Sequence, residues 1–307
     1  MTKPNGIIDA VPSRAAIIIA TKSRPGLVSL MLGQLEAQTV RPAKVIYSAH
    51  EDADIGARPD CTLPVEYVFG PPGISTQRNA ALQRLGDDID TVVFFDDDFV
   101  PSRFWVERVL AIFERSDVVA ASGHVVWDGA QSEGMTWNAG AELVSTQDAA
   151  VTAGAESKSD LRENATLYGC NMAARRSALK DICFDERLVL YSWMEDLDLS
   201  IRLARTGKVV WSSGLWGAHM GIKSGRTPGM QLGYSQLVNP WYLYKKGTLS
   251  RAQAISSMIR PLAANAMKSF FPEEYIDRRG RLKGNLLGLW ELIRYREDCR
   301  PEYAASL

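Results

Sequence analysis

Short apolar runs alternate along much of the chain with segments of helical periodicity. The runs 15–20, 44–48 and 65–69 have the length and the β-branched content of buried strands. Between the first two runs, Pro25 stands near a helix start and is followed by apolar residues at helical spacing. A strand, a helix and a second strand in this order predict a βαβ unit. We therefore expect an α/β fold with a mostly parallel central sheet flanked by helices.

The strongest local pattern is the apolar run 91–95, which is followed at once by Asp96, Asp97 and Asp98. This run predicts a strand buried on both faces, so three carboxylates lie at the edge where open α/β sheets bind ligands. Adjacent acids repel each other by roughly 1–4 kcal/mol per close pair in wet surroundings. A divalent cation shared with a phosphate is one way to balance them. The alternative is a solvated turn that caps a helix starting near Ser102.

A second candidate for a ligand contact follows the turn at residues 70–73. Ser75 is expected to cap a helix whose first turn contains Arg78 and Asn79, facing the same crevice. A cation in a first turn opposes the helix dipole, so Arg78 favours a role in ligand binding. A surface arginine beside a local asparagine bond is the alternative interpretation.

The middle of the chain has a less regular pattern. A helix is predicted over 102–115, and strands are predicted over 118–122 and 124–127. From 128 to 163 the sequence is rich in Gly, Ala, Ser and Thr. We interpret this segment as a β-meander or as loops over the crevice.

An amphipathic helix is predicted next, with Glu195 and Asp196 in its first turn. Acids there stabilise a helix by about 0.3–1 kcal/mol, which is a structural explanation for both. That explanation leaves open why the aromatic residues Tyr191 and Trp193 approach the same turn. His219 follows a strand predicted over 208–211, and neutral imidazole is a common metal ligand, although a lone histidine is more often structural.

The sequence changes character at about residue 225. Long helical stretches are predicted over 231–244 and 250–271, and a helical extension over 225–307 therefore follows a domain spanning 1–224. Basic residues are frequent in this extension, namely Arg260, Lys268, Arg278, Arg279, Arg281 and Lys283. The extension could be an acceptor platform, a homodimer face or a membrane-surface patch, and a solvated basic face is the simplest alternative.

Composition excludes several classes of protein. The chain has 46% hydrophobic and 23% charged residues, as ordinary globular proteins do, and its 35 Lys and Arg nearly balance 36 Asp and Glu, so nucleic acid is not expected as a partner. The four cysteines form no Cys-x-x-Cys pair, which argues against a zinc ribbon. Residues 1–13 lack the apolar run of a signal peptide. We expect a cytoplasmic protein, with peripheral contact at the inner face of the membrane left open.

Two nucleotide-binding fingerprints are absent. No Gly-x-Gly-x-x-Gly follows the first strand, which argues against a dinucleotide enzyme, and no Gly-x-x-x-x-Gly-Lys-Ser/Thr is present.

Taken in order, these motifs resemble those of the non-processive, inverting family 2 glycosyltransferases of the GT-A fold. The resemblance covers about 15–220. It rests on the order of five motifs, namely Thr21-Lys-Ser-Arg24-Pro25, Arg78-Asn79, Asp96-Asp97-Asp98, Glu195-Asp196-Leu-Asp198 and Gly217-Ala-His219. The resemblance implies that 1–224 is a catalytic domain that binds a nucleotide-sugar, and that the acceptor is a saccharide or a lipid-linked saccharide in cell-surface polysaccharide synthesis.

The resemblance also implies roles for individual residues. Mn²⁺ or Mg²⁺ would be held by Asp96, Asp98 and His219 and would act as a Lewis acid on the leaving diphosphate. Asp196 would be the catalytic base, with Glu195 orienting sugar hydroxyls. The nucleotide-sugar would be bound by a larger set, namely Thr21, Arg24, Arg78, Asn79, Asp96, Asp97 and Trp193, the last by stacking on a sugar face.

The sequence departs from the family pattern after the second strand. Many members carry a paired-Asp motif there that binds the base, whereas this chain has Ser48-Ala-His50-Glu51-Asp52. Ser48 or Asp52 would substitute for it, and a UDP-sugar is expected, with thymidine and guanosine nucleotides as alternatives. Two other functions stay open, a nucleotidyltransferase of similar architecture and a non-catalytic relative that binds nucleotide-sugars.

Overall fold

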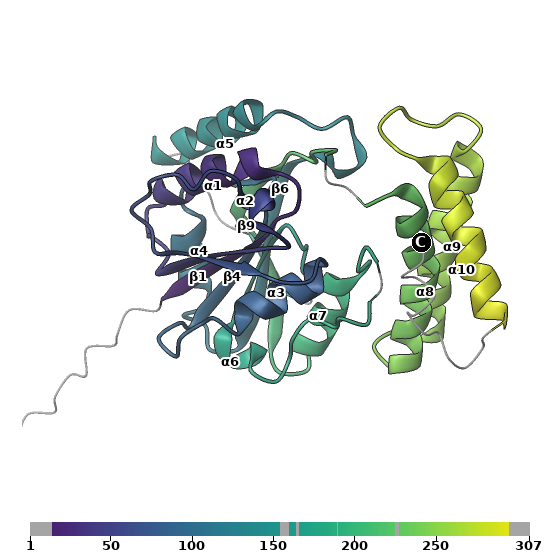
Figure 1. Cartoon of the computed structure of the whole chain (residues 1–307). Coiled ribbons are helices and arrows are strands. Elements are labelled where there is room, and N and C mark those ends of the chain that lie inside the picture. Colours follow the sequence, from purple (N-terminus) through teal and green to yellow (C-terminus); the bar gives the residue numbers. More distant parts are fainter. Residues whose placement is uncertain (1–13, 154–159, 164–165, 189, 225–226, 295–307) are drawn as a thin grey trace, which may run out of the picture.

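The computed structural model describes residues 14–153, 160–163, 166–188, 190–224 and 227–294. A central sheet carries helices on its two faces, and three further helices stand together at one side of it (Figure 1). The strands of the sheet follow the order β3-β2-β1-β4-β8-β6-β9-β5, and β7 pairs with β9. The predicted α/β class and the helical C-terminal region are confirmed.

The N-terminal half of the sheet is parallel, as predicted. It consists of β1 (Ala15–Ala20), β2 (Lys44–Ala49), β3 (Val65–Phe69) and β4 (Thr91–Asp96). Alternate residues of these strands enter two different cores. Ile17 and Phe95 pack on one face of the sheet, whereas Ile18 and Phe94 pack on the other. The apolar runs reflect this burial on both faces.

The second half of the sheet is mixed because β8 (Asn171–Arg175) runs antiparallel to both of its neighbours, β4 and β6 (Val118–Asp128). The long strand β9 (Lys208–His219) pairs in parallel with β6 and antiparallel with β5 (Phe99–Pro101) and β7 (Leu161–Glu163).

Two predictions about these strands were wrong, and one alternative does not hold. The alternative was that Asp96, Asp97 and Asp98 form a turn that caps a helix, but β5 follows them directly and pairs with β9. The two strands predicted over 118–127 are one strand with a register shift at Gly123, where a side chain would meet the carbonyl of Leu215. The strand predicted to end at residue 211 continues to His219 through its pairing with β6.

Seven α-helices of the described residues cover the sheet or its edges. They are α1 (Pro25–Glu36), α2 (Asp52–Ile55), α3 (Ile74–Leu82), α4 (Trp105–Ile112), α5 (Trp137–Thr152), α6 (Arg176–Leu179) and α7 (Glu195–Leu203), and a 3-10 turn η1 covers Gly129–Gln131. Ser75 does not cap α3, because the helix already starts at Ile74 and Gly73 is the residue at its N-cap. Helix α4 is shorter than the predicted range of 102–115, since Ser102 instead bonds α5.

Helix α5 corrects the prediction of a β-meander or loops over 128–163. Thr136 caps it by accepting a hydrogen bond from the Ala139 backbone. Asp148 anchors the helix from a buried position, where it accepts hydrogen bonds from the Ser102 hydroxyl at 2.6 Å and the Trp216 indole at 2.9 Å. The Gly- and Thr-rich composition had suggested a loop, but tertiary packing stabilises the helix.

The C-terminal region forms a three-helix bundle of α8 (Gly229–Lys246), α9 (Arg251–Lys268) and α10 (Arg278–Arg294), the last of which was not predicted. Helices α8 and α10 approach closely because Gly233 and Gly284 lie where they meet. A side chain at Gly233 would clash with the Arg281 carbonyl, and one at Gly284 with the Met230 carbonyl. A buried amide, that of Asn265, bonds Asn285 at 2.8 Å within the bundle.

Ion pairs connect the bundle to the sheet region. Lys246 at the end of α8 donates to the buried carboxylate of Asp198 in α7 at 2.8 Å and contacts Asp185 at 2.7 Å. Whether 1–224 and 225–307 are separate domains stays a prediction, and residues 225–226 lie outside the described residues.

Two other parts of the sequence analysis cannot be compared with the structure. Residues 1–13, which lack a signal-peptide pattern, and Cys299 lie outside the described residues. Among the residues that are described, none of the helices combines the length and the apolar character needed to cross a membrane.

Candidate active site

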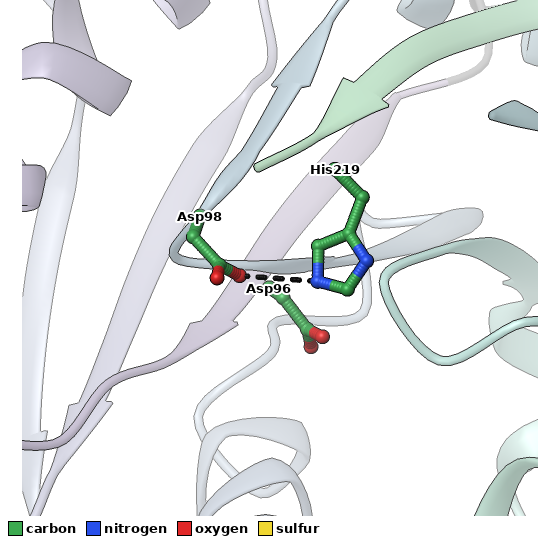
Figure 2. A group of neighbouring side chains, drawn as sticks. All are labelled: Asp96, Asp98 and His219. Atoms are coloured by element: carbon green, nitrogen blue, oxygen red, sulfur yellow. Dashed lines mark ion pairs between the residues drawn. The ribbon is translucent and has the colours of Figure 1, made fainter. Parts of the chain in front are cut away.

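Two strand ends bring the predicted metal ligands together. Asp96 ends β4 and Asp98 precedes β5, while His219 ends β9 and is the register partner of Phe99 in β5. One ligand atom from each of Asp96, Asp98 and His219 lies within 4.8 Å of the others, and the His219 Nε2 atom is 3.4 Å from Asp98 Oδ1 (Figure 2). Carboxylate oxygens with one imidazole suit Mn²⁺ and similar divalent ions, so these residues fit a metal.

The other ring nitrogen of His219 has a partner that the sequence analysis did not identify. Asp128 ends β6 and is the register partner of His219 in the parallel pair β6–β9. His219 Nδ1 lies 2.9 Å from Asp128 Oδ1, and the Tyr168 hydroxyl donates to the second oxygen of Asp128 at 2.8 Å. Such a carboxylate fixes the orientation of an imidazole and leaves Nε2 for a metal.

These carboxylates also set the protonation of the ring. Burial alone would lower the pKa of His219, but the hydrogen bonds to Asp128 and Asp98 outweigh it and raise this pKa to about 10. In the metal-free protein the imidazole is therefore a cation between two acids.

A second cluster fixes the loop after β1. The Thr21 hydroxyl donates to Asp97 at 2.7 Å, and the Arg24 guanidinium donates to the other oxygen of Asp97 at 2.7 Å. Arg24 also bonds the backbone carbonyls of Ile222 and Ser224, just beyond β9. Hydrogen bonds to Asp97 therefore join three of the residues predicted to bind the nucleotide-sugar, Thr21, Arg24 and Asp97 itself. Burial raises the pKa of Asp97 to about 7, although Arg24 opposes this shift.

Arg78 is the central cation of the site. It is only 1% exposed and donates to Asp96 at 3.0 Å, to Glu195 at 3.2 Å and to the Gly169 carbonyl at 2.7 Å. It thereby connects Asp96 at the end of β4 with Glu195 at the start of α7, which lies 117 residues beyond Arg78 in the chain. Its buried Nε atom has no hydrogen-bond partner. A buried donor without a partner is costly to the folded state.

The two acids that start α7 differ in their surroundings. Burial and the neighbouring charge of Asp196 raise the pKa of Glu195 to about 8, although Arg78 opposes this shift. Burial also raises the pKa of Asp196, but each of its oxygens accepts a backbone N–H, from Gly169 at 3.0 Å and from Leu197 at 2.8 Å. Both carboxyls thus lie close to Arg78 and Gly169.

Three predicted ligand contacts have other partners or lie apart from this cluster. Asn79 bonds the backbone of Phe184 in both directions, at 2.9 and 3.0 Å. Asp52 is 72% exposed at its side chain and pairs with Arg58. Trp193 is partly buried, and its ring lies 6.3 Å from that of Tyr191. Their roles in donor or acceptor binding stay predictions.

The turn that carries Trp193 has an unusual backbone. Leu190, Ser192 and Met194 all have positive φ angles, of 56°, 53° and 73°. Non-glycine residues rarely adopt this conformation, and such residues concentrate at functional sites. Tyr191 and Trp193 lie between these three residues. The two aromatic side chains therefore belong to one short segment that leads into Glu195.

Two further residues were missed. Asp54 is 3% exposed and accepts from the backbone of Ser23 at 2.6 Å and of His50 at 3.0 Å, so it joins the loops after β1 and β2. Gly169 bonds Arg78 through its carbonyl and Asp196 through its N–H. Asp54 could have been found from the sequence, because it lies two residues beyond Asp52 in the same acidic run. Gly169 could not, because it acts through its backbone and a glycine backbone contact has no sequence pattern.

Residues 62–183 match the sequence model of the family described as Glycosyl transferase family 2. No curated protein sequence matches the chain significantly. The matched segment contains Arg78, the acids Asp96 to Asp98, Asp128 and Gly169.

Solved structures with similarity to this chain include the three that follow. The mannosyltransferase PcManGT from Pyrobaculum calidifontis, in complex with GDP-Man and Mn²⁺, is 16% identical with a TM-score of 0.49, over 94% of this chain and 91% of that chain. S. aureus TarS is 15% identical with a TM-score of 0.45, over 84% of this chain and 44% of that chain. Its fragment TarS 1–349 is 14% identical with a TM-score of 0.48, over 94% and 93%. The chain therefore spans less than half the length of full TarS.

The family match covers the segment that contains Asp96, Arg78 and Asp128, and the fold belongs to the predicted α/β class. The comparisons therefore support a glycosyltransferase, through the match of residues 62–183 to the model of Glycosyl transferase family 2.

Proposed function

We propose that this protein transfers a sugar from a nucleoside diphosphate sugar to a hydroxyl of a saccharide or lipid-linked saccharide, with inversion at the anomeric carbon and in dependence on a divalent metal. The observation that carries the proposal is the position of Arg78. It connects Asp96, which belongs to the candidate metal site, with Glu195, which starts the helix that also carries the candidate base. Donor and acceptor chemistry would thus be joined by a single buried cation.

Asp96, Asp98 and His219 would hold the metal, and Mn²⁺ suits a site with one imidazole better than Mg²⁺ does. When bound, a divalent ion would act as a Lewis acid and neutralise charge on the leaving diphosphate. The residues of the chain prepare this site. Asp128 holds the His219 ring so that Nε2 faces the carboxylates, and the backbone N–H of Ile222 donates to Asp98 at 2.8 Å.

The loop after β1 would form one wall of the nucleotide site. Thr21 and Arg24 would act chiefly through Asp97, since their polar atoms bond it in this structure. Arg24 also holds the segment 222–224, which follows His219, against this loop. Asp54 bonds the backbone of this loop and of the neighbouring loop after β2, and would therefore influence which nucleotide base the donor site accepts. We propose a uridine nucleotide as the donor to test first.

Acceptor activation would fall to the start of α7. The acceptor oxygen forms a bond to the anomeric carbon while the bond from that carbon to the diphosphate oxygen breaks, and the hydroxyl proton passes to Asp196. Backbone N–H groups of Gly169 and Leu197 hold the Asp196 carboxylate in place. Glu195 and Trp193 would orient the sugars, the second by stacking on an apolar sugar face.

A donor screen followed by kinetics tests this function. Thermal shift with Mn²⁺ and UDP-, dTDP- or GDP-sugars should identify the donor, because a ligand that binds the native state raises its melting temperature. Hydrolysis of that donor is then measured for the native protein, Asp98→Ala and Asp196→Asn. Asp117→Asn is the control, because Asp117 is exposed and precedes β6, whereas Asp128 of the site lies at the other end of that strand.

Each outcome has a different meaning. We expect Asp98→Ala to lose metal-dependent donor binding, and Asp196→Asn to keep donor binding but lose turnover. Unchanged donor affinity in Asp98→Ala would contradict the metal site. Normal turnover in Asp196→Asn would remove Asp196 as the base, and donor binding without any turnover in the native protein would favour a non-catalytic relative.

A further inference from the structure

Exposed apolar side chains concentrate in the C-terminal bundle. Of the fifteen large hydrophobic side chains that are exposed among the described residues, nine lie between residues 251 and 294. The most exposed are Phe271 at 89%, Phe270 at 76% and Met267 at 69%, at the end of α9 and in the connection to α10. Isolated exposed hydrophobic residues need no explanation, but a concentration of them marks an interaction surface.

The connection between α9 and α10 is held in a defined shape. The Arg278 guanidinium donates to both oxygens of Glu273 at 2.9 and 3.0 Å, and Lys268 pairs with the same carboxylate at 2.5 Å. Arg279 donates to the Ser269 carbonyl at 3.2 Å. Polar contacts therefore fix both ends of the connection, while Phe270 and Phe271 between them face outwards.

The bundle beneath this connection is closely packed. Close contacts of α8 and α10 at Gly233 and Gly284 leave no room for a side chain, and Asn265 and Asn285 form a buried hydrogen-bond network with Gln236. The exposed phenylalanines are thus carried by a well-packed scaffold and do not result from loose packing.

The charge of the two helices that carry this connection favours an anionic partner. Helices α9 and α10 contain eight Lys and Arg against one acid, Glu291, although the whole chain has a net charge of −1. The connection itself adds three acids, of which Glu273 is paired with Lys268 and Arg278. A second copy of the chain would bring two basic faces together, which is unfavourable. An anionic lipid surface, in contrast, accepts both apolar side chains at the headgroup boundary and basic residues around them.

We propose that the connection between α9 and α10 docks the protein on an anionic phospholipid bilayer, with Phe270 and Phe271 entering the interface and the basic residues of α9 and α10 contacting the headgroups. The proposed contact is peripheral, and none of the described helices combines the length and the apolar character needed to cross a bilayer. This contact is weakened by salt because part of it is electrostatic.

The position of this connection deepens the proposed function, on which the following step rests. Tyr275 in the connection lies under the Lys223 ammonium, 5.4 Å from the ring centroid. Lys223 follows His219 by four residues, and its neighbour Ile222 donates to Asp98. The connection lies at the end of the bundle where α8 begins and the chain arrives from β9 (Figure 1). Docking there would bring the metal site close to the bilayer, which suits an acceptor carried on a lipid.

Vesicle sedimentation of the full chain tests the docking. Phosphatidylcholine vesicles are compared with vesicles that also contain phosphatidylglycerol, at low and high salt. We expect binding to the anionic vesicles, and partition weaker by at least about tenfold in the double variant Phe270→Ser, Phe271→Ser. Leu30→Ser, which removes a 42% exposed leucine from α1, is the control and should bind as the native protein does.

Two other results would overturn the docking. One is the absence of binding to anionic vesicles, or equal binding by the double variant with an unchanged melting temperature. The other is a native dimer in light scattering that the double variant converts to a monomer, without vesicle binding, because the surface would then be a dimer face. Asp98→Ala separates this inference from the catalytic proposal, since it should bind vesicles normally whether or not the metal site is correct.

Discussion

Asp198 is expected to be a structural residue, although it belongs to the same short motif as Glu195 and Asp196. Its side chain is fully buried and pairs with Arg202 and Lys246, each at 2.8 Å. It also accepts a hydrogen bond from the Thr248 hydroxyl at 2.9 Å. Since Lys246 and Thr248 lie at the end of α8, Asp198 fastens the C-terminal bundle to α7.

The change Asp198→Ala leaves two buried cations without their shared carboxylate. Removing one member of a buried ion pair typically costs about 3–5 kcal/mol. The lower end of this range applies here, because Lys246 keeps Asp185 at 2.7 Å and Arg202 keeps the Cys183 carbonyl at 2.5 Å. We therefore expect the free energy of unfolding to fall by about 3 kcal/mol.

Urea denaturation followed by circular dichroism measures this loss. Asp117→Ala is a matched control, because Asp117 also pairs with two cations, Arg115 and Lys208, but is 48% exposed at its side chain. The loss for Asp117→Ala should be much smaller, since solvent screens exposed pairs. Equal losses in the two variants would refute the reasoning. A stable Asp198→Ala protein that no longer binds the donor would place Asp198 in the site instead.

Two further predictions concern the site. In metal-free protein, the stability that accompanies the raised pKa of Glu195 is fully present below pH 4.5 and is lost as the pH rises through about 8. The melting temperature of Glu195→Gln should therefore rise relative to that of the native protein between about pH 5.5 and about pH 8.5. A difference between the two melting temperatures that does not change with pH would contradict this prediction. Asp128→Ala should weaken Mn²⁺ binding by about ten- to a hundredfold in calorimetry, because Asp128 orients the His219 ring. The affinity of Asp128→Asn should lie between that of Asp128→Ala and that of the native protein. An unchanged affinity would show that Asp128 does not orient His219.

The parallel half of the fold was predictable because its strands are buried on both faces. Such burial leaves continuous apolar runs, as in β1 and β4, and the acids that follow β4 then fall at the ligand-binding edge of the sheet. His219 could be added from the order of the motifs, and the structure brings it to within 3.4 Å of Asp98.

Other features depend on contacts that a sequence does not reveal. Asp128 reaches His219 only because β6 and β9 pair in parallel, which joins residues 91 positions apart. Helix α5 has the composition of a loop, and buried contacts of Asp148 with Ser102 and Trp216 stabilise it. In both cases a residue acquires its role from a partner that is distant in sequence, so local propensity and spacing were insufficient.

The account depends most directly on His219 as a metal ligand. Pulsed electron paramagnetic resonance of the protein loaded with Mn²⁺ detects magnetic coupling between the ion and a nitrogen that binds it. The chain contains three histidines, so His50→Ala and His124→Ala serve as controls. We predict a coupling from one imidazole in the native protein and in both controls, and its loss in His219→Ala. Tight Mn²⁺ binding without nitrogen coupling, or coupling that persists in His219→Ala, would contradict the proposed site.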